Sequence, residues 1–177
     1  PYTENSFVEQ LDELITKLSI HPPIYLVGFS LGGNIACHFA LRFANKIKKI
    51  CLISPTTGNH LPKALKIFQI PILGYILFSI FSEKVMQNGI ERIFSNPEEQ
   101  SVFFIKWNQQ MQLKGYKYAL FSTYRNILYK KSDYIYKHLA NHDFDVYLIW
   151  GTGDKIVPFK NSEIIRNSLE KCVFFSI

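Results

Sequence analysis

The segment from Ile24 to Gly33 constrains this chain more than any other part of its sequence. It reads Ile-Tyr-Leu-Val-Gly-Phe-Ser-Leu-Gly-Gly, and Asn-Ile-Ala follows it. The apolar, partly β-branched start predicts a strand, the glycines predict a sharp turn at Ser30, and the residues after the turn predict a helix. A strand that turns directly into a helix crowds its apex, so we expect side chains at positions 28 and 32 to clash with neighbouring backbone, which explains Gly28 and Gly32.

This turn gives Ser30 the setting that a serine nucleophile requires. A serine hydroxyl is a poor nucleophile at neutral pH and needs exposure, a base and donors for an oxyanion. At a helix N-terminus, free backbone N–H groups and the dipole favour negative charge. We therefore predict Ser30 as the nucleophile and the N–H of Leu31 as an oxyanion-hole donor. A chance Gly-x-Ser-x-Gly is the competing interpretation, but the strand before it and the helix after it favour the nucleophile.

Composition predicts one folded domain with a substantial core, because 47% of the 177 residues are hydrophobic and 19% are charged. The net charge of +6 raises nucleic-acid binding as one interpretation. The best candidate is the stretch 116–137, where tyrosines alternate with lysines and an arginine. However, Leu120, Tyr124 and Ile127 recur there at helical spacing, which favours an amphipathic helix with a solvated basic face. We predict no nucleic-acid partner.

The three cysteines, Cys37, Cys51 and Cys172, fall in one predicted helix and two predicted strands. Their odd number and their spacing match no metal site, so buried thiols are the better interpretation. Cysteines that remain free thiols favour a reducing, intracellular setting, although the localisation stays open. Neither a metal nor a cofactor is predicted.

Helices and strands alternate along the chain. A capping-box pattern that starts at Ser6 predicts the first helix, and another helix follows the turn at Ser30 as far as about Ala44. The remaining elements are predicted as strands over residues 47–54, 146–150 and 172–177 and a helix over residues 161–171. Continuous apolar strands separated by helices predict a mostly parallel sheet with helices on both faces.

Between residues 60 and 141 the strand pattern disappears and helical segments take over. We predict that residues 1–59 and 142–177 form the core of an α/β domain. Residues 60–141 are then an inserted helical cap over the carboxyl ends of the strands, where open α/β sheets bind their ligands.

The first part of this cap, residues 64–81, is very apolar. Gln69, Pro71 and Gly74 interrupt it, so the uninterrupted run is too short for a membrane span. We expect part of this segment to pack against the core. The other side chains are expected to line an apolar substrate pocket or to contact a membrane surface.

Three pieces of the chain together resemble the serine-dependent members of the α/β-hydrolase family, the esterases, lipases and C–C bond hydrolases. They are the segment Gly28–Gly33, the segment Trp150–Pro158 and the helical insertion between them. The resemblance covers nearly the whole chain. It implies that Ser30 is the nucleophile, that the N–H of Leu31 is half of the oxyanion hole, and that Asp154 orients a catalytic histidine.

Asp154 has a competing interpretation as an ordinary turn residue in Gly-Thr-Gly-Asp. It follows the carboxyl end of a predicted strand, which puts it at the same edge of the sheet as Ser30. This shared edge favours the catalytic role.

The chain departs from the family pattern at its histidine. In the family this residue comes after the last strand, and the sequence ends at Ile177, inside that predicted strand. Of the five histidines only His60 falls at the catalytic edge, and a loop or cap role suits it better. We therefore expect a fragment that holds the C-terminal half of the sheet and lacks the family's first strands, the second oxyanion donor and the histidine.

An unpaired apolar strand edge invites aggregation. We expect residues 1–177 alone to be poorly soluble and inactive as a hydrolase, and a monomeric, cooperatively folding preparation would contradict this expectation.

The resemblance implies a serine hydrolase that acts on a carboxylic ester through an acyl-enzyme on Ser30. The apolar cap favours an apolar acyl group, so the expected partner is a small apolar ester or a lipid-like substrate. C–C bond hydrolases, thioesterases and acyltransferases share the same turn and stay open as alternatives. A non-catalytic binding protein is a further alternative, and peripheral membrane contact would occur through the cap. The oligomeric state is left open.

Overall fold

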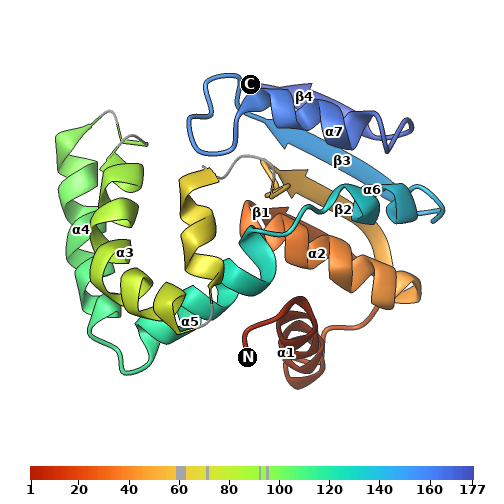
Figure 1. Cartoon of the computed structure of the whole chain (residues 1–177). Coiled ribbons are helices and arrows are strands. Elements are labelled where there is room, and N and C mark those ends of the chain that lie inside the picture. Colours follow the sequence, from red (N-terminus) through yellow and green to blue (C-terminus); the bar gives the residue numbers. More distant parts are fainter. Residues whose placement is uncertain (59–62, 71, 92, 95) are drawn as a thin grey trace.

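The computed structural model describes residues 1–58, 63–70, 72–91, 93–94 and 96–177 (Figure 1). It contains a sheet with helices packed against it and, beside this part, a separate group of helices. The separate group comes from the middle of the chain, coloured yellow to green in Figure 1.

The sheet has four strands whose order in space equals their order along the chain. They are β1 (Ile24–Phe29), β2 (Ile47–Ile53), β3 (Asp145–Trp150) and β4 (Val173–Ser176). All three pairings are parallel, so the carboxyl ends of the strands meet at one edge. Ile53 of β2 lies opposite both Phe29 of β1 and Ile149 of β3. The predicted parallel sheet is therefore confirmed, with β1 as an edge strand.

One face of this sheet carries the main hydrophobic core. The helices on it are α1 (Glu4–Lys17), α2 (Leu31–Arg42), α6 (Asp133–Leu139) and α7 (Ser162–Arg166), with the short 3₁₀ turns η1 (Ala44–Lys46) and η4 (Phe159–Asn161). Leu52, Leu148 and Phe174 are in register on neighbouring strands and point into this core. The central helix α2 packs against β1, β2, α1 and α6, and its Phe39 is completely buried.

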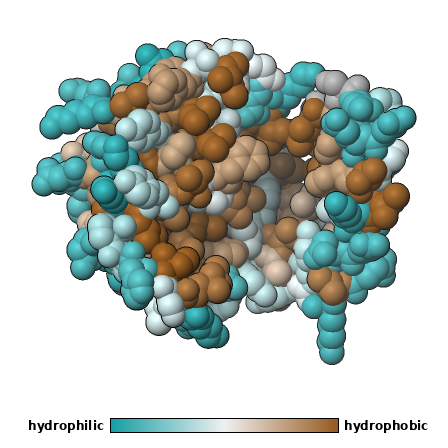
Figure 2. All heavy atoms as spheres, turned by 180° about the vertical axis from the view of Figure 1, so that it is seen from behind, coloured by the Kyte–Doolittle hydropathy of each residue, from teal (hydrophilic) through white to brown (hydrophobic). Residues whose placement is uncertain are grey.

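The opposite face of the sheet has no helix against it within the described residues. Tyr25, Val27 and Phe29 of β1 are 63%, 63% and 67% exposed, and Val173 and Phe175 of β4 are about half exposed. Figure 2 views the molecule from behind and shows hydrophobic surface gathered over the sheet. The strands are apolar toward both faces, as the sequence indicates, but the described helices cover one face instead of the predicted two.

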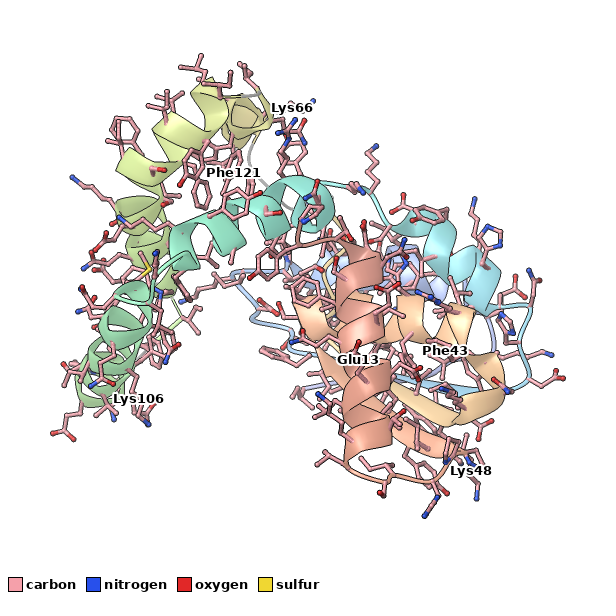
Figure 3. The ribbon with its side chains drawn as sticks, turned by 90° about the horizontal axis from the view of Figure 1, so that it is seen from below. Glu13, Phe43, Lys48, Lys66, Lys106 and Phe121 are labelled. Atoms are coloured by element: carbon pink, nitrogen blue, oxygen red, sulfur yellow. The ribbon has the colours of Figure 1, made fainter. Side chains whose placement is uncertain are left out.

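The predicted helical insertion is present between β2 and β3. Its elements are η2 (Lys63–Gln69), α3 (Leu73–Glu91), α4 (Pro97–Met111), α5 (Tyr116–Thr123) and the π-helical turn η3 (Tyr124–Leu128). Phe68, Phe78 and Phe121 form a small buried core of its own, and Figure 3 shows Phe121 between α5 and α3. In the π-helical turn, the N–H of Tyr129 donates to the carbonyl of Tyr124, five residues earlier, at 3.2 Å.

The limits of this cap at residues 60 and 141 stay a prediction. Helix α6 lies inside that range but packs against α2 and α7. Its side chains Ile135, Tyr136 and Leu139 belong to the main core. The helices that stand apart from the sheet are therefore those from η2 to η3.

Helix α1 begins two residues before the predicted capping box. Thr3 is its N-cap, and the Thr3 hydroxyl accepts a hydrogen bond from the N–H of Ser6 at 3.3 Å. The Ser6 hydroxyl lies 2.9 Å from the Thr3 hydroxyl and takes the place that Glu or Gln has in the usual box. The prediction that Ser6 caps the helix is therefore wrong, because Thr3 already does so.

Candidate active site

Ser30 stands at the apex between β1 and α2. Its φ of 52° lies in the left-handed region, which residues other than glycine seldom adopt. The N–H of Ser30 donates to the carbonyl of Ile53 at 2.9 Å, and the carbonyl of Ser30 accepts from Gly33 and Thr56, each at 3.1 Å. β2, the loop after it and the first turn of α2 thus hold the strained residue in place.

The glycines beside Ser30 differ in their structural roles. A Cβ on Gly28 would stand 2.5 Å from the carbonyl oxygen of Gly32, and a Cβ on Gly33 would stand 2.7 Å from the Cβ of Pro55. A Cβ on Gly32 would meet no atom within 4 Å. The expected clash is therefore confirmed at Gly28 and wrong at Gly32, because the side of α2 at Gly32 faces open space.

Leu31 is the first residue of α2, and its backbone N–H donates no hydrogen bond to any described atom. The first N–H groups of a helix have no partner inside the helix, and the dipole of the 12-residue α2 favours negative charge there. An oxyanion that forms on a group attached to the Ser30 side chain could therefore accept a hydrogen bond from the free N–H of Leu31. The assignment of Leu31 to the oxyanion hole stays a prediction that this geometry supports.

Asp154 lies in the loop after β3, and its carboxylate organises that loop. One carboxylate oxygen, Oδ1, accepts hydrogen bonds from the N–H groups of Ile156 and Val157, both at 2.9 Å. The indole of the completely buried Trp150 donates to the carbonyl of Val157 at 3.0 Å and anchors the loop to the core. Oδ2 makes no hydrogen bond to the described residues, so it is available to a further partner.

Ser30 and Asp154 line one cavity of about 460 Å³. β1 and β3 flank β2, so the residues that follow them are separated by two strand spacings, about 10 Å. The other lining residues are Phe29, Ser54, Ile93, Gly151, Gly153, Lys155, Ile156 and Val157. Because Ile93 belongs to the helical insertion, the insertion supplies part of the cavity wall.

No described histidine lines this cavity. His38 sits on α2, where burial is the main cause of its lowered pKa, with Lys130 lowering it further and Glu4 opposing. His142 precedes β3, at the opposite end of the sheet, and stacks on Phe144 at 5.5 Å. His60 lies outside the described residues, so its position is not tested.

The cavity also holds three residues that the sequence reasoning missed. Ser54 follows β2, is nearly buried and has a φ of 40°; its place after a parallel strand is a signal that sequence reasoning could have used. Lys155 follows Asp154 directly in sequence. Ile93 carries no such signal, because its position depends on how the insertion packs.

The thiols and the metal-binding residue types are placed elsewhere. Cys37 is completely buried, which raises its pKa, whereas Cys51 and Cys172 are half-buried and their pKa values are raised by the same cause. In the part of the chain that the structure describes, no three His, Cys, Asp or Glu side chains gather as a metal site would require.

Comparisons with known proteins agree with the fold described above. A family model described as the α/β-hydrolase fold matches residues 1–76. The human monoacylglycerol lipase ABHD6 is 23% identical over 185 residues, which cover 93% of this chain and 51% of the lipase. The first 76 residues of the chain thus match the α/β-hydrolase fold, and the lipase is similar to nearly the whole chain. The chain spans about half the length of the curated relative that it matches.

Solved structures of several enzymes superpose on nearly the whole chain. An esterase from Exiguobacterium antarcticum has a TM-score of 0.73 at 18% identity, over 99% of this chain and 65% of the esterase. A bromoperoxidase from Bacillus anthracis has a TM-score of 0.75 at 17% identity, over 99% of this chain and 66% of that protein. At such low identities these likenesses establish the fold alone.

Proposed function

We propose that the protein is a serine hydrolase that cleaves carboxylic esters with an apolar acyl group through an acyl-enzyme on Ser30. The observation that carries the proposal is the shared cavity, in which Ser30 at a strained apex faces the same space as Asp154. The esterase and lipase names of the relatives support ester chemistry. Because the chain spans only part of these relatives, the activity is proposed for the whole protein.

In this mechanism the Oγ of Ser30 attacks the ester carbonyl carbon and forms a tetrahedral oxyanion. The N–H of Leu31 donates to that oxyanion at the N-terminus of α2. Collapse of the intermediate expels the alcohol and leaves the acyl group on Ser30, and water then hydrolyses the acyl-enzyme. In the family that the chain resembles, a histidine takes the serine proton and returns it to the departing oxygen, which leaves as the alcohol. Oδ2 of Asp154 would orient that imidazole, because Oδ1 is held by Ile156 and Val157.

Apolar acyl groups suit the walls of the cavity. Phe29, Ile93 and Val157 supply apolar surface next to Ser30. Ser54 and Lys155 supply polar groups at the same cavity and suit the ester oxygen atoms or the alcohol part of the substrate. A lipid-like ester fits this division into an apolar wall and a few polar groups.

A fluorophosphonate probe tests the nucleophile, because it forms a covalent bond with an activated serine. We expect the whole protein to be labelled at Ser30, as located by mass spectrometry of its peptides, and Ser30→Ala to abolish both labelling and p-nitrophenyl ester hydrolysis. Ser101→Ala is the matched control, since this hydroxyl is exposed on α4 outside the cavity and should leave labelling intact.

Unchanged hydrolysis in Ser30→Ala would refute the mechanism. Ester binding without labelling or turnover would favour the non-catalytic binding protein. Cleavage of a C–C bond or a thioester in place of an oxygen ester would point to another reaction class that the same turn serves.

A further inference from the structure

The start and the outer side of helix α3 carry exposed isoleucines. Ile72, Ile76 and Ile80 follow one another at intervals of four residues and are 79%, 49% and 62% exposed. The opposite side of α3 packs inward through the buried Phe78 and Ser82. Because residues four apart lie on one helix face, Ile76 and Ile80 share a side of α3. Ile72 directly precedes the helix, and its carbonyl accepts a hydrogen bond from the N–H of Ile76 at 3.0 Å, so the stripe begins at the N-terminal end of α3.

Two further apolar side chains widen this stripe. Ile70 and Leu73 are 46% and 47% exposed, and the N–H of Gly74 donates to the carbonyl of Ile70 at 2.8 Å, which holds the preceding chain against the start of the helix. We name these five residues, Ile70, Ile72, Leu73, Ile76 and Ile80, the cap-tip patch. Monomeric proteins seldom expose so many large apolar side chains together unless the surface contacts a partner or a membrane.

The charges around the cap-tip patch are basic. Between residues 63 and 82 the only charged residues are Lys63 and Lys66, and Figure 3 shows Lys66 beside the start of α3. Lys84 continues the isoleucine stripe after one more helical turn, and its aliphatic stem can cover apolar surface while its ammonium group reaches outward. The nearest acidic residue, Glu83, pairs with Lys117 at 3.2 Å. This pattern complements an anionic surface.

None of the described helices combines the length and the apolar character that a membrane span requires. An apolar stripe flanked by lysines is typical of a helix that lies in the plane of a lipid surface. We propose that the cap-tip patch docks the protein on an anionic lipid surface, with the isoleucines inserted and Lys66 and Lys84 against the headgroups. The docking builds on the proposed function, because lipid-like esters are concentrated in such a surface.

Vesicle co-sedimentation of the purified protein tests this inference. We expect more binding to vesicles of phosphatidylcholine with phosphatidylglycerol than to phosphatidylcholine alone. The double variant Ile76→Ser and Ile80→Ser should lower the partition coefficient about tenfold, since two side chains would no longer insert. The double variant Lys66→Glu and Lys84→Glu should remove the preference for phosphatidylglycerol. Circular dichroism checks that each variant is folded.

The matched control is Val27→Ser with Val173→Ser, which alters exposed valines on the uncovered sheet face and should leave vesicle binding unchanged. Loss of binding in this control, or full binding by the isoleucine variant, would overturn the proposal. A dimer that light scattering detects in the unchanged protein and that dissociates in the isoleucine variant would also overturn it, because a second copy would then cover the patch.

The outcomes for docking and for catalysis are separable. Ser30→Ala should bind vesicles as the unchanged protein does, and the isoleucine variant should keep its labelling by a soluble fluorophosphonate. If the unchanged protein docks on vesicles but is not labelled, only the proposed function is refuted. If it is labelled but does not dock, only the docking proposal is refuted.

Discussion

Gly28 and Gly32 approach each other so closely that a Cβ on Gly28 would stand 2.5 Å from the carbonyl oxygen of Gly32. The reverse is not true, since a Cβ on Gly32 would meet open space. The two glycines of one motif therefore differ in whether they can be replaced by a residue with a side chain.

We expect Gly28→Ala to lower the free energy of unfolding by about 1–3 kcal/mol, because backbone must move to admit the methyl group. Gly32→Ala should be neutral or stabilise the protein by up to about 1 kcal/mol, since alanine is favoured over glycine in a helix. Urea unfolding of both variants measures the difference. Equal losses at the two positions would contradict the geometry.

Asp154 is expected to have two separable roles, one for each carboxylate oxygen. Asp154→Asn keeps an oxygen that can accept from Ile156 and Val157 and so should keep the loop and the stability. It removes the charge that orients and stabilises an imidazolium, so ester hydrolysis by the whole protein should fall by about ten-thousandfold. Asp154→Ala should lose both activity and stability. Comparable hydrolysis by Asp154→Asn and the unchanged protein would mean that Asp154 is only a turn residue.

His38 should make the stability depend on pH. Burial lowers the pKa of His38 in the folded state, so the unfolded chain binds a proton more readily than the folded one. The stability is therefore complete above the ordinary histidine pKa of about 6.5 and decreases as the pH falls below it. Urea midpoints at about pH 7.5 and pH 5.5 should differ less in His38→Gln than in the unchanged protein. An unchanged difference would show that other groups cause the pH dependence.

The uncovered sheet face should make the 177-residue chain self-associate. Val27 and Phe175 are exposed on edge strands β1 and β4, where unpaired strand edges also template further pairing. Val27→Lys with Phe175→Lys should raise the monomeric fraction measured by size-exclusion chromatography with light scattering. Ile105→Lys is the control, since Ile105 is similarly exposed on α4, and it should have less effect.

The sequence predicts the strands well because each carries a continuous apolar run bounded by turn residues. It predicts helix boundaries less well, because capping residues compete: Thr3 and Ser6 are both good N-caps, and which one starts α1 depends on a hydrogen bond between them. The helical stretch predicted over residues 116–137 divides into α5, η3 and α6. Its apolar spacing persists, but one part packs in the cap and the other in the main core.

The residues of the candidate site also divide into those that a local sequence motif predicts and those whose position depends on tertiary packing. Ser30 and Asp154 could be predicted because each follows a strand in a motif whose backbone geometry is strongly restricted. Predicting Ser54 as a cavity residue requires knowing that β2 lies between β1 and β3, and this strand order is a property of the tertiary fold. Ile93 required the packing of the insertion. The uncovered face could not be foreseen, because two-sided apolar strands look the same in sequence whether or not a second layer is present.

The π-helical turn at residues 124–128 connects the part of the chain that lies apart from the sheet to the part that packs on it. A π-helical turn contains one residue more than the corresponding stretch of α-helix. Removing that residue would rotate α5 by about 100° about its axis relative to the chain that follows the turn. An insertion or deletion at this one junction is therefore expected to turn the cap relative to the sheet, with every residue around Ser30 unchanged.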